Sequence, residues 1–170
     1  KYLHWLFLDR QDIKAGLKTI LAAIEKVKNG IAICIFPEGT RNKTKDTFLP
    51  FHEGSFKIAE KGNVPIIPMT IVNSAAIFED HFPKIKKATV VIEYGKPIYM
   101  KDLDKETRKS MGTYVQNIIS ETYFKNKELI YYLMFSGEGD LLGDQKKIIR
   151  RFSLFRIIAH GISVSAHQIM

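Results

Sequence analysis

The sequence is poor in cysteine and has no long apolar run. Cys34 is the single cysteine among 170 residues, which excludes an internal disulfide framework and fits a reducing compartment. No stretch approaches the roughly 18 apolar residues that a membrane-spanning helix needs, and no signal peptide is visible. Because Cys34 lies inside an apolar run, we expect it to be a small core residue and not a nucleophile.

Sequence signatures of metal, nucleotide and RNA binding are also missing. No spacing of histidine, cysteine and acidic residues matches a metal site, and no GxxxxGK[ST] segment is present to hold a nucleotide. The pattern of stacked aromatic and basic residues that RNA-binding folds carry is absent too. We therefore expect no metal, no bound cofactor and no nucleic-acid partner.

Positive charge is the main excess. The chain has 26 lysines and arginines against 18 acidic residues, which gives a net charge of +8 and a pI near 9.5. Such a balance favours an anionic partner, which is a phosphorylated substrate, an anionic membrane surface or a nucleic acid, and charge alone does not choose among them. The remaining composition, 45% hydrophobic and 26% charged, is typical of one globular domain.

Strand-like and helix-like segments alternate along the chain. Apolar and β-branched runs predict strands at residues 3–8, 31–35, 65–72 and 89–94, whereas helical spacing predicts helices at 13–27, 53–61 and about 105–125. Alternation of this kind predicts an α/β fold with a mostly parallel mixed sheet flanked by helices. We expect one domain over residues 1–132 and a divergent basic tail over residues 133–170.

The most informative segment follows the second predicted strand. Phe36, Pro37, Glu38, Gly39, Thr40 and Arg41 stand directly after the apolar run at 31–35. Gly39 permits a positive φ or a close approach of the backbone to a ligand, and Arg41 offers a planar set of donors that suits phosphate or carboxylate. Open α/β sheets bind ligands at the carboxyl ends of their strands. Taken alone, the segment is equally compatible with a solvated surface turn.

A second polar cluster ends the first predicted strand. Asp9 and Arg10 follow Leu8, so that parallel strands would bring Arg10 and Arg41 to the same edge of the sheet, where both could hold one phosphate. The alternative is that Asp9 and Arg10 simply pair with each other at the surface.

These segments together resemble a known family. Three ordered blocks and two shorter pieces carry the resemblance: Phe7-Leu8-Asp9-Arg10, Phe36-Pro37-Glu38-Gly39-Thr40-Arg41, Val64-Pro65-Ile66-Ile67-Pro68, Leu49-Pro50-Phe51 and Glu53-Gly54-Ser55-Phe56. They are similar to blocks of the glycerolipid acyltransferases, and in particular of the 1-acylglycerol-3-phosphate (lysophosphatidic acid) acyltransferases. The similarity runs from about Tyr2 to Tyr123.

The resemblance implies transfer of a fatty acyl group from acyl-CoA or acyl-carrier protein to the free hydroxyl of lysophosphatidic acid, giving phosphatidic acid. By the same resemblance, Asp9, Arg10 and the segment Phe36–Arg41 would form the acceptor site. Val64, Pro65, Ile66, Ile67 and Pro68 would line the site or the acyl path. We expect a cytoplasmic protein, peripheral at the inner face of an anionic membrane.

The family's catalytic block, a His-x4-Asp pair in which histidine is the general base, is expected upstream of this chain. The chain begins at Lys1 in strand-like sequence, so we expect it to be the later part of a longer protein, inactive by itself. His4 and Asp9 have the right spacing, but this pair overlaps the Asp9-Arg10 block. Positions five apart on a strand also point to opposite faces, so we interpret the pair as a decoy.

Two other hypotheses stay open at this point. One is a sibling acyltransferase that uses glycerol 3-phosphate or another lysophospholipid as its acceptor. The other is a non-catalytic module that binds anions or membranes through its charge of +8.

Overall fold

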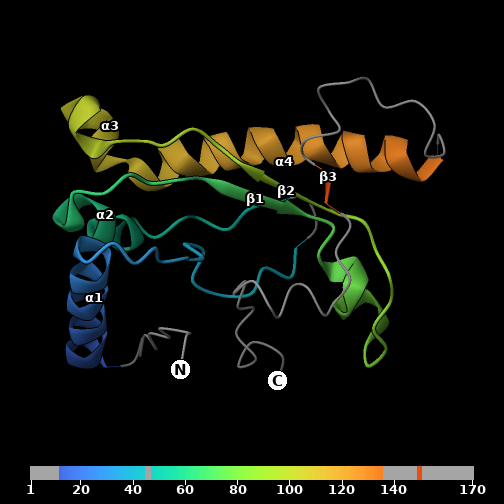
Figure 1. Ribbon diagram of the computed structural model, residues 1–170, viewed down its shortest axis with the longest axis horizontal. Helices are drawn as coiled ribbons and strands as arrows, with labels where there is room; N and C mark the ends of the chain where they lie inside the picture. The colour runs from blue at the N-terminus through green and yellow to red at the C-terminus, as the bar shows by residue number, and fades with distance from the viewer. Residues whose placement is uncertain (1–11, 45–46, 136–148, 151–170) are drawn as a thin grey trace. The chain divides into compact units, whose positions relative to one another are not determined.

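The structure is a computed structural model that describes residues 12–44, 47–135 and 149–150 (Figure 1). The described residues fall into two compact units. Unit 1 holds the residues up to Ile67 together with Lys96–Asn117, and unit 2 holds Pro68–Gly95 together with the residues from Ile118 onward.

The first helix described in unit 1 is α1, Ile13–Lys28, whose ends are set by local sequence. The Asp12 carboxylate accepts hydrogen bonds from the backbone N–H groups of Lys14 and Ala15 at 2.8 and 3.1 Å, which satisfies two amides that the first turn leaves without helical partners. Asn29 is the C-cap, and Gly30 follows it with φ of +79°. The predicted helix at 13–27 is confirmed.

Further helical segments follow in unit 1. The 3₁₀ helix η1, Glu53–Phe56, leads directly into α2, Lys57–Gly62, which confirms the predicted helix at 53–61. A Cβ added at Gly62 would lie 2.5 Å from Cγ2 of Val27, so the absence of a side chain at Gly62 lets α2 approach α1 closely. Residues 96–117 add η4, Met100–Asp102, and α3, Lys105–Lys109.

The predicted helix at about 105–125 is in fact two helices. Asp104 caps α3 through hydrogen bonds from the N–H groups of Glu106 and Thr107. The helix stops at Ser110, and α4 then runs over Met111–Phe135, well beyond the predicted end. None of the helices among the described residues is long and apolar enough to cross a membrane.

Unit 2 contains a small sheet in the order β1-β2-β3 (Figure 1). Its strands are β1, Met69–Val72, β2, Val90–Tyr94, and β3, Ile149–Arg150. β1 and β2 pair from Met69 opposite Tyr94 to Val72 opposite Val91, and β3 pairs with β2 through Ile149 opposite Val91. Two short 3₁₀ helices, η2 (Ala75–Ile77) and η3 (Glu79–His81), lie between β1 and β2 in the chain.

The core of unit 2 joins the sheet to α4. Val72 and Val91 are buried together with Ile130, and Tyr123 packs against them. Asn126 of α4 is also buried, at 1% exposure, and its amide donates to the carboxylate of Glu93 at 2.8 Å. Burial of this amide is tolerated because its donor has a charged acceptor.

Two predictions about the sheet need correction. The mixture of helices and strands agrees with the predicted α/β class, but both described strand pairs are antiparallel, whereas a mostly parallel sheet was predicted. β1 and β2 are antiparallel because residues 73–89, which connect them, contain only η2 and η3. Parallel neighbours need a longer crossover, usually an α-helix.

The second correction concerns residues 31–35, which were predicted to form a buried strand. In the structure these residues belong to no strand, and Ala32, Cys34 and Ile35 are exposed. A strand requires a hydrogen-bonded neighbour, and none of the described segments pairs with residues 31–35. The predicted tail at 133–170 is described only at residues 133–135 and 149–150.

Candidate functional site

The segment Phe36–Arg41 forms a tight turn in unit 1. The Gly39 N–H donates to the Phe36 carbonyl at 3.1 Å, and Gly39 has φ of +69°, a conformation that a residue with a Cβ adopts at a cost. The carbonyl of Pro37 accepts a hydrogen bond from the His52 N–H at 2.9 Å. Of the two uses of Gly39 that the sequence offered, a positive φ and a close approach to a ligand, the structure shows the positive φ.

Glu38 holds the turn against the following segment. Its Oε2 accepts a hydrogen bond from the Leu49 N–H at 3.2 Å, and the residue is half-buried. Together with the contact between Pro37 and His52, this bond fixes the turn beside residues 49–52. The sequence similarity already grouped Leu49-Pro50-Phe51 with the turn, but no local pattern indicated that the Glu38 carboxylate would be the link.

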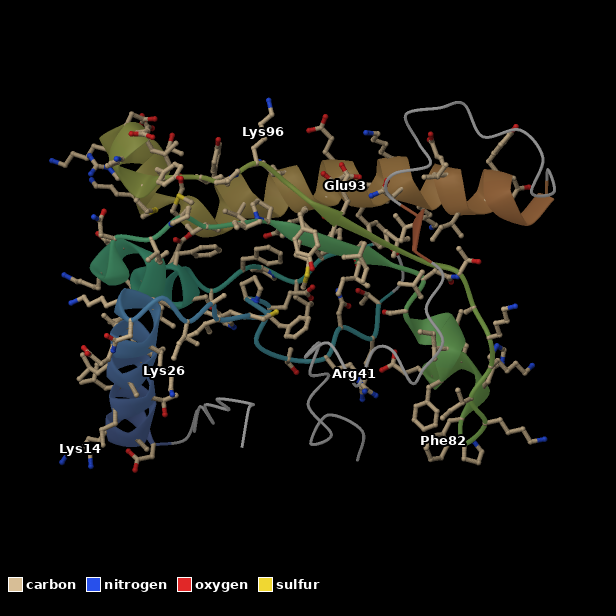
Figure 2. All side chains as sticks on the ribbon, in the orientation of Figure 1. Lys14, Lys26, Arg41, Phe82, Glu93 and Lys96 are labelled. Carbon is tan, nitrogen blue, oxygen red and sulfur yellow. The ribbon has the colours of Figure 1, made fainter. Side chains whose placement is uncertain are left out.

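The cationic end of the turn lies at the surface. Thr40 and Arg41 are exposed, and Figure 2 shows the Arg41 side chain on this loop. Immediately afterwards, Asn42 donates to the Thr47 carbonyl at 2.6 Å and accepts from the Thr44 N–H at 2.9 Å. Arg41 therefore stands at the surface between two hydrogen-bonded turns.

The segment beside the turn is anchored to the first turns of α4. The Phe51 N–H donates to the Gln116 side chain at 3.4 Å, and the Gly112 N–H donates to Oε1 of Glu53 at 2.8 Å. Phe51 and Phe56 are buried. Neither contact was predicted, because the partners are 65 and 59 residues apart in the sequence and follow from the fold alone.

Residues 64–68, predicted to line the site or the acyl path, run across the division between the units. In unit 1, Ile66 forms an antiparallel bridge with Ile98, and Ile67 is 52% exposed. In unit 2, Pro68 is buried and its carbonyl accepts from the Gly95 N–H at 2.8 Å. The apolar surface of Ile67 is available to a ligand, and the lining role stays a prediction.

The remaining site residues cannot be placed. His4, Asp9 and Arg10 lie outside the described residues, so the expected convergence of Arg10 and Arg41 stays a prediction. His52, next to the anchored segment, is exposed. Across the described ranges, no group of three or more histidine, cysteine and acidic residues could hold a metal ion.

Cys34 differs from its predicted environment. The residue is exposed and not part of a core. Although the residue is exposed as a whole, partial burial of its thiol raises the pKa above the usual cysteine value, which lowers the fraction of reactive thiolate. The prediction that Cys34 is a core residue is wrong, but the raised pKa still argues against a nucleophile.

Comparison with known proteins places these features in a family. Residues 1–72 match the family model described as Acyltransferase, a range that includes both the turn at 36–41 and residues 64–68. The 1-acyl-sn-glycerol-3-phosphate acyltransferase of Saccharomyces cerevisiae is 30% identical over 127 residues, which are 74% of this chain and 41% of the yeast protein. The enzyme of the same name from Helicobacter pylori is 34% identical over 112 residues, 61% of this chain and 47% of that protein.

A solved structure agrees with the sequence comparison. The crystal structure of the 1-acyl-sn-glycerophosphate (LPA) acyltransferase PlsC from Thermotoga maritima superposes with a TM-score of 0.58 at 27% identity, covering 66% of this chain and 45% of PlsC. The α/β class is confirmed by this neighbour. The chain spans less than half the length of these relatives. By sequence and by fold, this chain belongs to the acyltransferase family.

Proposed function

We propose that the protein transfers a fatty acyl group from acyl-CoA or acyl-carrier protein to the free hydroxyl of 1-acylglycerol 3-phosphate, giving phosphatidic acid. The relatives named above act on this acceptor by their names, and both the family match and the structural neighbour support the same reaction. The observation that carries the proposal within this chain is the Phe36–Arg41 turn, whose backbone is fixed and whose arginine is exposed.

The turn is suited to hold the phosphate of the acceptor. Arg41 supplies a planar donor set for two phosphate oxygens, and Gly39, which has no Cβ, lets the backbone approach the ligand. Glu38 acts indirectly, since its carboxylate holds the turn through the Leu49 N–H. Arg10 is proposed as a second phosphate ligand, and Ile67 as part of an apolar lining for the acyl chain.

The chemical step needs a base that this chain does not convincingly supply. The acceptor hydroxyl attacks the thioester carbonyl carbon, a C–O bond forms, and the C–S bond breaks as the thiol leaves. A histidine takes the hydroxyl proton and passes it to the leaving sulfur. Of the five histidines in the sequence, only His4 has an aspartate at the required spacing, and we propose that the base comes from a different His-x4-Asp pair.

Acceptor binding by the chain itself tests the proposal. A monomeric short-chain lysophosphatidic acid is titrated into the protein by calorimetry, and Arg41→Ala is expected to weaken binding about 10- to 100-fold. The reason is that one charge-assisted phosphate contact contributes about 1.5–3 kcal/mol. Lys43→Ala is the matched control, since Lys43 is exposed, lies two positions away and carries the same charge.

The same titration separates the alternatives. Monoacylglycerol, which lacks the phosphate, is expected to bind weakly and equally to the wild type and to Arg41→Ala. Equal losses for Arg41→Ala and Lys43→Ala, together with a steep fall in binding to any polyanion with salt, would instead support a non-catalytic anion-binding module. A panel with glycerol 3-phosphate and other lysophospholipids identifies the acceptor.

A further inference from the structure

A loop in unit 2 exposes an apolar tip, and we call residues 78–87 the Phe82 loop. Phe82 is 68% exposed and Ile85 is 54% exposed, with the exposed Pro83 between them in sequence. Figure 2 shows Phe82 at the outer end of the connection between η3 and β2. Large apolar side chains that lie close together in the sequence and remain in water indicate an interaction surface more strongly than isolated ones do.

The Phe82 loop is held in place by contacts at its base. The Lys86 N–H donates to the Ile77 carbonyl at 2.8 Å, and the Asn73 amide donates to the Thr89 carbonyl at 2.9 Å. The ring of Phe78 packs edge-to-face on Phe82, with centroids 5.3 Å apart and planes at 71°. Because the tip is already ordered, binding through it loses little conformational entropy.

Lysines lie within and directly after the apolar tip. Lys84, Lys86 and Lys87 are exposed, and within the described part of the chain none of them forms an ion pair. Two acids, Glu79 and Asp80, precede the tip, so the loop carries more positive than negative charge. Protein–protein interfaces are depleted in lysine, whereas lysines beside apolar side chains suit a bilayer, where their ammonium groups reach the anionic headgroups.

We propose that the Phe82 loop docks this protein on an anionic lipid bilayer. Phe82 and Ile85 enter the boundary between headgroups and acyl chains, and the three lysines contact lipid phosphates. This docking surface rests on the proposed function in one respect, because a bilayer is where a lysophosphatidic acid acceptor resides. Vesicle binding can be measured without any catalytic turnover.

Vesicle co-sedimentation tests the apolar part of the proposal. Phosphatidylcholine vesicles that contain phosphatidylglycerol are expected to bind the wild type. Phe82→Ser is expected to lower the partition coefficient about tenfold, since it removes a large apolar side chain that enters the bilayer in the docked state. Ile85→Ser is a second variant that leaves the ring contact of Phe78 in place. Tyr94→Ser is the matched control, because Tyr94 is 63% exposed in the same unit but outside the loop.

Matched charge variants test the role proposed for the three lysines of the Phe82 loop. Substituting Lys84, Lys86 and Lys87 together with Gln is expected to weaken binding to the anionic vesicles about fivefold per lysine removed. The control removes the same charge from three exposed lysines of unit 1, and these are Lys96, Lys105 and Lys109. Equal losses in the two triple variants would show attraction through net charge alone and would overturn the assignment to this loop.

Two further results would overturn the proposal that the Phe82 loop docks on a bilayer. Unchanged vesicle binding by both Phe82→Ser and Ile85→Ser would overturn the proposal, as would self-association in the absence of lipid that Phe82→Ser abolishes. Titration with monomeric short-chain lysophosphatidic acid, without vesicles, measures the acceptor site separately. Phe82→Ser is expected to leave that affinity unchanged, so a failed docking surface and a failed acceptor site give different results.

Discussion

At the scale of single residues, Gly39 carries a conformation that few other residues tolerate. Its φ of +69° lets the turn at 36–41 close between Phe36 and the Gly39 N–H. We predict that Gly39→Ala lowers the free energy of unfolding by about 1–2 kcal/mol, the strain of a left-handed conformation at a residue with a Cβ, and weakens acceptor binding. Urea titration and calorimetry measure the two effects.

Gly39→Asn provides the control for that prediction. Asparagine populates positive φ far more readily than alanine does, so it is expected to recover most of the lost stability. If the alanine and asparagine variants were equally destabilised, the backbone conformation would not be the cause.

Asp104 predicts a pH dependence of stability. Hydrogen bonds from the hydroxyl and N–H of Thr107, and from the N–H of Glu106, lower the pKa of the Asp104 carboxyl. A lowered folded-state pKa means that the stabilisation is present above the ordinary aspartate pKa of about 4 and is lost as the pH falls through the lower folded value. We predict that wild-type stability declines over this acidic range more steeply than that of Asp104→Asn.

The asparagine variant is informative because it caps a helix without a titrating group. The measurement is the difference in chemical unfolding free energy between the two proteins as the pH is lowered. A difference that stayed constant with pH would contradict the role given to the Asp104 carboxylate.

At the scale of elements, the close approach of α4 to the segment before η1 predicts a strict requirement for glycine. A Cβ at Gly112 would lie 2.6 Å from the Phe51 carbonyl oxygen and 2.7 Å from Oε1 of Glu53. We predict that Gly112→Ala destabilises the protein by about 1–3 kcal/mol, since the backbone at Phe51 must move. Gly54→Ala is the control in η1, where an added Cβ meets nothing within 4 Å.

Thermal unfolding monitored by circular dichroism compares these two alanine variants. A lower melting temperature is expected for Gly112→Ala and little change for Gly54→Ala. Equal melting temperatures would show that α4 can shift away from Phe51 without loss.

Helices were predicted better than strands, because the residues that begin and end a helix act on their neighbours in the sequence, whereas a strand depends on a partner strand. The ends of α1 follow from Asp12 and from Asn29-Gly30, which act on neighbouring backbone groups. The apolar run at 31–35 looks like a strand locally, but a strand is defined by a partner that may be far away in sequence. The antiparallel register of β1 and β2 likewise depends on the path of residues 73–89.

At the scale of the whole molecule, the residues of the candidate site could be predicted from the sequence better than the contacts that hold them in place. The residues of the turn at 36–41 could be chosen as candidates from the sequence because an acid, a glycine and an arginine have distinct chemical properties. The link from Glu38 to Leu49, and the anchors at Gly112 and Gln116, come from tertiary contacts over 11 to 65 residues and have no local signature.

The distribution of histidines predicts the activity of residues 1–170 taken alone. We expect acyl transfer to lysophosphatidic acid about 10²–10⁴-fold slower than by a full-length relative, which is the contribution of a positioned general base. A radiolabelled acyl-CoA assay measures the rate. Turnover equal to that of a full-length relative, abolished by His4→Ala and retained by His52→Ala, would show that His4 and Asp9 are catalytic after all.

The exposed position of Cys34 gives the protein a built-in attachment point. As the chain's one cysteine, it lies two residues before Phe36, so a maleimide spin label or fluorophore would attach there without any mutation. Because the pKa of the thiol is raised, labelling is expected to be slow at neutral pH and to quicken as the pH rises. A probe at this place reports directly on whether an acceptor changes the motion of the adjoining turn.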